Sequence, residues 1–162
     1  MNGVDFTFMY VGIPHYGKIR PGVERLLKNQ LSKNRNLICF SAGPSKYIEA
    51  ALEAAGLRKY FNKILTETDL SFDNSRYIKD ISKFTKSIDD AVAIDDKQKN
   101  FPGDLQKRLV HVQPYYGIDD KDDYELEQLE SSIEMKFATK QIISTVFNKT
   151  KNAKLYNFIL GS

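Results

Sequence analysis

The sequence is poor in several features that would mark a specialised protein. It has one cysteine and no tryptophan in 162 residues, so it cannot carry an internal disulfide or a cysteine-based metal cluster. No apolar run approaches the ~20 residues of a membrane-spanning helix, and the first residues lack the basic leader and apolar stretch of a signal peptide. The net charge of +3 is too small to indicate nucleic acid as a partner. We therefore expect an intracellular protein without a transmembrane segment or direct nucleic-acid binding, in the nucleus, the cytoplasm or the mitochondrion.

The residues that are present indicate an α/β domain. Hydrophobic residues make up 41% and charged residues 28%, which is typical of a chain that buries one core. Three short apolar runs without polar alternation lie at residues 37–40, 92–94 and 109–112. Such runs are typical of strands buried on both faces of a parallel sheet. The spacing of apolar residues predicts helices over 21–33 and 45–56, and Ser45 is expected to cap the second helix.

The first residues show a different pattern. Residues 4–11 alternate apolar and polar side chains, which predicts a half-buried strand, and the turn residues 12–15 predict a second strand that returns beside it. Later in the chain, the polar residues 66–76 are expected to form a loop.

The C-terminal quarter divides by charge. Residues 119–134 hold eight acidic side chains and one lysine, whereas residues 135–162 hold five lysines and no acid. Apolar residues at helical spacing predict an acidic helix followed by a basic one. We therefore divide the chain into a domain over 1–135 and a basic helical extension over 136–162. The extension either packs on its own domain or docks onto a protein partner or, through 136–160, onto an anionic membrane surface.

Three polar features accompany the predicted parallel strands. Ser41 closes the first apolar run, Asp95 and Asp96 close the second, and Lys79 lies between them in sequence. Ligands of open parallel sheets gather outside the carboxyl ends of the strands. A hydroxyl and an ammonium group can hold phosphoryl oxygens, and carboxylates can hold magnesium. Each residue alone has a structural explanation, as a cap, a surface lysine or a loop carboxylate, so their order along the chain is the informative part.

That order resembles the haloacid dehalogenase (HAD) superfamily, and more closely its FCP/NLI-interacting-factor-like phosphatase branch. The matching pieces span residues 20 to about 135, and they are Arg20-Pro21-Gly22-Val23, Phe40-Ser41-Ala42-Gly43 with Tyr47, Tyr77-Ile78-Lys79-Asp80-Ile81-Ser82, Ile94-Asp95-Asp96 with Asn100-Phe101, and Pro114-Tyr115-Tyr116-Gly117. The resemblance implies a three-layer Rossmann-like domain with a central, mostly parallel sheet and a small N-terminal hairpin. It also implies that Ser41 binds the phosphoryl group, that Lys79 neutralises it, and that Asp95, supported by Asp96, holds magnesium.

The chain departs from this family at its first motif. The family carries Asp-x-Asp-x-Thr at the end of the central first strand, where the first Asp is the nucleophile and the second the general acid/base. The chain contains no such motif. In one account, Val4-Asp5-Phe6-Thr7 is a degenerate first motif and Asp5 is the nucleophile. In the other, which the alternation favours, residues 4–19 are the flap hairpin that follows the first motif, and the first strand is absent.

An absent first strand would leave a gap in the central sheet. Two unpaired strand edges inside a core are costly, so the gap must be filled. We consider that residues 4–11 are diverted into it, that a partner chain or a second copy supplies a strand, or that the missing strand lies upstream of Met1.

Two classes of function follow. The absent nucleophile favours a pseudo-phosphatase that binds proteins as a subunit of an assembly, and the resembled branch includes such a case in the inner-membrane receptor of the mitochondrial presequence translocase. The retained residues favour the alternative, a magnesium-dependent phosphoserine/phosphothreonine phosphatase with an aspartyl-phosphate intermediate, which uses Asp5 or belongs to an N-terminally truncated enzyme. On this chain alone we expect little or no turnover.

Overall fold

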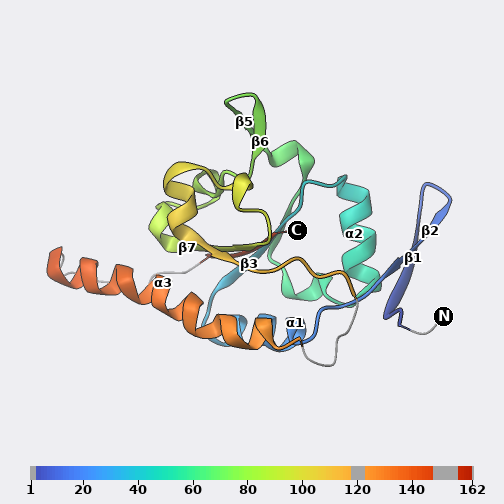
Figure 1. Ribbon diagram of the computed structural model, residues 1–162, viewed down its shortest axis with the longest axis horizontal. Helices are drawn as coiled ribbons and strands as arrows, with labels where there is room; N and C mark the ends of the chain where they lie inside the picture. The colour runs from blue at the N-terminus through green and yellow to red at the C-terminus, as the bar shows by residue number, and fades with distance from the viewer. Residues whose placement is uncertain (1–2, 118–122, 148–156, 162) are drawn as a thin grey trace.

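The computed structural model describes the backbone of residues 3–117, 123–147 and 157–161, and side chains as far as residue 138. In chain order its helices and strands are β1 (Phe6–Tyr10), β2 (Ile13–Gly17), α1 (Val23–Ser32), β3 (Asn36–Phe40), α2 (Ser45–Ala54), β4 (Lys63–Leu65), β5 (Ser71–Asp73), β6 (Arg76–Ile78), β7 (Ala91–Asp95), β8 (Leu109–His111), α3 (Glu125–Phe147) and β9 (Asn157–Gly161). Short 3₁₀ segments lie between several of them. The chain therefore has the mixed α/β class that the sequence predicts (Figure 1).

A five-stranded sheet forms the centre of the fold. Its strand order is β4-β3-β9-β7-β8, and neighbouring strands pair in parallel. The three apolar runs predicted as strands occupy β3, β7 and β8. Their side chains are buried on both faces because Leu37 and Val92 join one hydrophobic cluster while their neighbours Ile38 and Ala93 join another.

The strand in the middle of this sheet comes from the C-terminal end of the described chain. β9 pairs in parallel with β3 on one side and with β7 on the other. In this structure the middle position is therefore occupied by residues 157–161 of the chain itself, and residues 4–11 are not diverted into it. Within the described residues, the expected helical extension is helical over 136–147, whereas Asn157–Gly161 form a strand.

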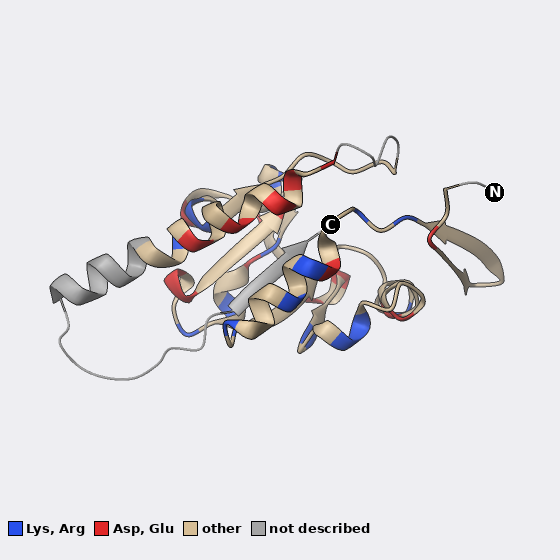
Figure 2. Cartoon of the chain, turned by 90° about the horizontal axis from the view of Figure 1, so that it is seen from below, with Lys and Arg blue, Asp and Glu red and all other residues tan. Residues whose placement is uncertain are grey.

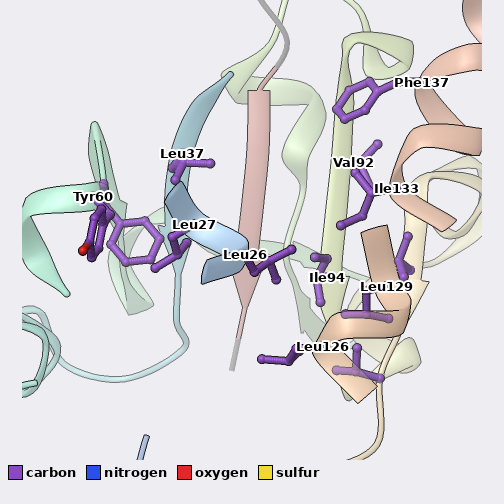
Figure 3. Close-up of a cluster of buried hydrophobic side chains, with 13 residues drawn as sticks. Leu26, Leu27, Leu37, Tyr60, Val92, Ile94, Leu126, Leu129, Ile133 and Phe137 are labelled. Atoms are coloured by element: carbon purple, nitrogen blue, oxygen red, sulfur yellow. The ribbon is translucent and has the colours of Figure 1, made fainter. Parts of the chain in front are cut away.

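Helices α1 and α3 cover one face of the sheet (Figure 3). In Figure 3, Leu26 of α1 lies beside Ile94 and Leu27 lies near Leu37 and Tyr60, while Ile133 of α3 lies beside Val92. The periodicity of these apolar residues explains why both segments form helices and bury these stripes. The opposite face is covered by a second cluster whose members include Phe40, Leu65, Ile81, Phe101 and Leu105. Apart from the strands themselves, this cluster draws on short 3₁₀ segments and loops and not on an α-helix.

Residues 4–19 lie outside the central sheet. β1 and β2 pair antiparallel in a sheet of their own, and the turn is formed by Val11 and Gly12, which both have positive φ angles. The turn predicted at residues 12–15 therefore lies at Val11 and Gly12 instead. Residues 13–15 belong to the second strand, Ile13–Gly17. The hairpin rests on α2 through Tyr47, whose ring makes edge contacts with Phe8 and His15. This arrangement agrees with the interpretation of residues 4–19 as a hairpin outside the central sheet.

Three local predictions need correction. Ser45 does not cap α2, because the N-cap position is Pro44 and no side chain caps this helix. The predicted loop at 66–76 contains strand β5 and the start of β6, joined by a turn at Asn74 and Ser75. The acidic and basic helices are one continuous helix, α3. Among the described residues, none of the helices combines the length and apolar character needed to cross a bilayer.

Candidate functional site

The carboxyl edge of the central sheet brings together most of the residues that the sequence singled out. Ser41 follows the last residue of β3, and Asp95 is the last residue of β7. The register aligns Phe40 with Gly161 and Ile94 with Leu160, so the end of β9 lies between Ser41 and Asp95. Both predicted site residues are almost fully buried there.

Lys79 reaches this edge from the end of β6. Its Nζ lies 2.6 Å from Oδ2 of Asp95, and the side chains are 1% and 0% exposed. Its backbone N–H donates to the carbonyl of Asn100, which fixes the start of the side chain. The same Nζ lies 5.8 Å from the centre of the Phe40 ring, one residue before Ser41. Lys79 therefore contacts Asp95 at the end of β7 and lies near the Phe40 ring at the end of β3.

The environment of Lys79 opposes its charge. Burial lowers the pKa of the Lys79 ammonium, and the negative charge of Asp95 acts in the other direction. A charged pair in such a place is retained only because each group compensates the other. Lys79 and Asp95 therefore form a direct ion pair that is shielded from solvent.

The remaining oxygens at this edge are partly engaged. Oδ1 of Asp95 accepts a hydrogen bond from the backbone N–H of Lys97 at 2.7 Å, and the Ser41 hydroxyl accepts one from the N–H of Gly43 at 3.2 Å. Oδ1 of Asp96 is buried and has no hydrogen-bond partner in the described part of the chain. Asp96, the residue that follows Asp95, therefore holds one unused acceptor.

Asp5 lies at the start of the β1–β2 hairpin, outside the central sheet. Its carboxylate accepts a hydrogen bond from the backbone N–H of Ile19 at 2.7 Å, at the base of the β1–β2 hairpin. Its side chain is exposed, and its strand is not part of the central sheet. Its role as a nucleophile stays a prediction, and the fold does not place it at the end of a central strand.

The donors at this edge fit a magnesium ion poorly. Both oxygens of Asp95 already accept hydrogen bonds, one of them from a cation, and Asp96 adds one free oxygen. Within the ranges that the structure describes, no three His, Cys, Asp or Glu side chains are grouped to hold a metal. Magnesium prefers several hard oxygen ligands, usually including more than one carboxylate.

Two contributions to this region were not predicted. Thr66 follows β4 at the same edge, is 4% exposed, and forms a capping box with Asp69; the spacing Thr-x-x-Asp was a readable signal for it. Arg20, quoted above only as part of a motif, donates to Asp123 at 2.9 Å and to the carbonyl of Gln113 at 2.8 Å. It thereby ties the segment after the hairpin to the start of α3.

Residues 3–144 match the model of a family described as NLI interacting factor-like phosphatase. No curated protein matches the chain. The family model covers most of the chain, including the hairpin, the sheet edge and most of α3.

Proposed function

Because the chain belongs to the NLI interacting factor-like phosphatase family, whose HAD-like members generally use magnesium, we propose that it is a pseudo-phosphatase that acts as a protein-binding subunit of an assembly. The observation that carries this proposal is the middle strand of the sheet. β9 lies where the resembled enzymes carry their nucleophile strand, and residues 157–162 contain no Asp or Glu.

The arrangement of layers supports the fold assignment within the proposal. A sheet with parallel neighbours and a hydrophobic cluster on each face is what a three-layer Rossmann-like HAD domain requires. In such sheets the reactive groups stand at the carboxyl edge. Ser41, Lys79 and Asp95 stand at that edge here.

The chemistry at this edge supports inactivity. An aspartyl-phosphate mechanism needs a carboxylate nucleophile and a second acid/base group, and loss of the acid/base alone costs on the order of 10²–10⁴-fold in rate. The described edge offers the hydroxyl and the lysine without such a nucleophile, and Lys79 is held by Asp95. The residues that remain support descent from an active phosphatase.

The β1–β2 hairpin supports a role in protein binding. Four of its apolar side chains are more than half exposed: Met9, Val11, Ile13 and Tyr16. The hairpin stands apart from the central sheet, beyond α2 (Figure 1). Contiguous exposed apolar residues often mark interaction sites, and a projecting hairpin presents them to a partner without disturbing the core.

A hydrolysis assay tests the proposal. The whole chain is incubated with p-nitrophenyl phosphate and with a phosphoserine peptide, in magnesium and in EDTA. We expect turnover at the background rate of buffer alone, and the same rate for Asp5→Asn and Ser41→Ala. Magnesium-dependent hydrolysis that Asp5→Asn abolishes would contradict the proposal and establish the phosphatase alternative with Asp5 as nucleophile.

A further inference from the structure

The β1–β2 hairpin packs on the rest of the protein through one of its two faces. Residues that pair directly across antiparallel strands share a face, and successive residues along a strand alternate between the faces. The inner face contacts the ring of Tyr47 in α2 through three rings, at centroid distances of 5.1 to 5.3 Å: Phe8, Tyr10 and His15. This packing holds the hairpin on α2 and turns its other face away from the helix.

The outer face of the hairpin consists of two cross-strand pairs, Thr7 with Tyr16 and Met9 with Pro14. All four residues are exposed within the described part of the chain, Met9 at 61% and Tyr16 at 52%. The solvent-facing side of an antiparallel sheet is normally polar, whereas this one presents a thioether, a proline ring and a phenol ring. A sheet buries such a face against another element, so the outer face is suited to binding.

The turn extends this apolar surface at a conformational cost. Val11 and Gly12 form a two-residue turn, and their φ angles are positive, 50° and 74°. Asn, Asp or Gly normally occupy such positions, and a β-branched residue is strained there. Val11 is also 79% exposed, so the strain is not offset by burial. Backbone strain at an exposed tip favours a contact with another molecule.

The absence of charge on the hairpin indicates what that molecule is. Residues 6–17 contain no Asp, Glu, Lys or Arg, in a chain of which 28% of the residues are charged. Contacts with a different protein are usually specified by complementary charges. In a contact about a two-fold axis, each charge near the axis instead meets its like, so the patch has to be uncharged. The hairpin satisfies this condition, and its His15 lies on the inner face.

The edges of the hairpin are less suited to a partner than its outer face. Pro14 gives β2 a position without an N–H, and proline is one of the devices by which edge strands avoid pairing with a further strand. β1 lies against α2. Both features disfavour the addition of a strand and leave the outer face as the binding surface.

We propose that two copies of this chain associate through the outer faces of their β1–β2 hairpins, which stack face to face about a two-fold axis. Stacked sheets pack about 10 Å apart with their side chains interdigitated, so Met9 and Tyr16 of one copy pack against those of the other. The inference rests on the protein-binding role proposed above for the hairpin and names the partner. Strands of five residues give a contact smaller than the ~1,200–2,000 Å² of stable interfaces, so the dimer is weak and forms at high protein concentration.

Opposite charges at Met9 test the two-fold contact directly. Sedimentation velocity of the whole chain over a wide range of concentration measures self-association. Met9→Lys and Met9→Glu each place like charges across the axis, so each variant should associate with itself about tenfold or more weakly than the parent does. An equimolar mixture of the two variants pairs Lys with Glu and should recover the dimer. Binding of the hairpin to a different protein predicts no such recovery.

Met135→Lys is the matched control, because Met135 is 65% exposed and lies on α3, outside the hairpin. It should associate like the parent, and circular dichroism checks that each variant is folded. A parent chain that stays monomeric at every concentration would overturn the inference. The same holds for a folded Met9 variant that associates like the parent, a mixture that stays monomeric, or an equal loss in Met135→Lys.

Failure of this inference is distinguishable from failure of the proposed function. Phosphate hydrolysis by a chain that dimerises as described would overturn the pseudo-phosphatase and leave the dimer standing. A chain that neither hydrolyses phosphate nor associates would overturn the dimer alone.

Discussion

Lys79 and Asp95 form the most buried ion pair described in the protein, and their energetics differ from those of a surface pair. Both side chains are nearly inaccessible, and their charged atoms are 2.6 Å apart. Removing one member of a buried pair leaves the other charge uncompensated in a medium that solvates it poorly. Loss of either member alone therefore destabilises the folded protein, whatever the pair contributes to catalysis.

Lys79→Met should lower the free energy of unfolding by about 3–5 kcal/mol, because it leaves the Asp95 carboxylate buried without its cation. Urea denaturation followed by circular dichroism measures this change. Lys107→Met is the matched control, since Lys107 pairs with Asp104 on the surface, and it should leave the midpoint unchanged. Equal effects of the two substitutions would mean that Asp95 is solvated in the folded protein.

Glu134 provides a test of pH dependence. Arg35 donates two hydrogen bonds to its carboxylate, at 2.7 and 2.9 Å, and Lys33 adds a third at 2.8 Å. These cations lower the pKa of Glu134 from 4.5 to about 2. A lowered folded-state pKa means that the contribution to stability is complete above pH 4.5 and is lost as the pH falls toward 2.

Glu134→Gln should therefore destabilise the protein at pH 7 by about 1 kcal/mol, since the carboxylate is partly exposed and its interactions are screened by solvent. Denaturation midpoints of parent and variant, measured from pH 7 down to pH 2.5, should converge as the pH falls. Glu127→Gln, which breaks the exposed pair with Arg25, serves as the control and should change the midpoint little at any pH. A difference that stays constant with pH would assign the effect to packing.

At the scale of elements, the position of β9 follows from its neighbours. Ile38 and Ala93, which flank Ile159 in the register, are buried in the cluster on one face. Leu37 and Val92, which flank Phe158, are buried in the cluster on the other, so β9 completes a sheet that is covered on both faces. Without it, the facing edges of β3 and β7 would each expose unpaired backbone groups inside the core.

Ile159→Pro should destabilise the protein by about 3 kcal/mol or more, because proline cannot donate to the ladder and is excluded from central strands. Thermal unfolding followed by circular dichroism measures the loss. Ile159→Val keeps the backbone donor and most of the side-chain volume, so its cost should stay near 0.5–1.5 kcal/mol. If the proline variant is as stable as the valine variant, β9 does not hold the middle of the sheet.

The elements differ in how far the sequence predicts them. Continuous apolar runs identify β3, β7 and β8, because only a doubly covered strand tolerates four apolar residues in succession. β9 could not be predicted in the same way, because its three apolar residues also fit a helical stripe and only the vacant slot decides between the two. The β5–β6 hairpin was missed although Asn74-Ser75 is a turn signal, since its strands are three residues long.

The site shows the same division between local and tertiary information. The order of Ser41, Lys79 and Asp95 along the chain predicts that they meet, and the parallel sheet brings Asp95 to the same edge as Ser41 with Lys79 in contact. Asp5 was a candidate because Val4-Asp5-Phe6-Thr7 could be a degenerate first motif, whereas the pairing of β1 with β2 places this segment in a separate sheet. Which segment fills the middle of the sheet is decided by contacts between distant segments, which composition and spacing do not record.

At the scale of the whole molecule, separate parts are joined through a few charged contacts. Arg20 ties the segment after the hairpin to the acidic start of α3 through Asp123 and Glu125, and Arg35 ties the start of β3 to Glu134 further along the same helix. Figure 2 shows acidic residues gathered on the first turns of α3 and basic residues on the segments around the sheet. These carboxylates are used to hold α3 in place, which leaves the carboxyl edge of the sheet with few acidic ligands.

Magnesium should therefore leave the stability of the whole molecule unchanged. A ligand that binds only the folded state at 100 times its Kd adds about 2.7 kcal/mol, which for a chain of this size raises the Tm by roughly 5–10 °C. The carboxyl edge offers one unused Asp96 oxygen and an Asp95 carboxylate that already accepts two hydrogen bonds.

We expect the Tm in 10 mM MgCl₂ to match that in EDTA at equal ionic strength, with CaCl₂ as a control for unspecific effects of divalent ions. A rise of several degrees that is specific to magnesium and absent from Asp96→Asn would show that this edge still binds the metal, because a charge-neutral amide of the same shape supplies a weaker ligand. In that case the protein would retain its metal site and would lack only the nucleophile.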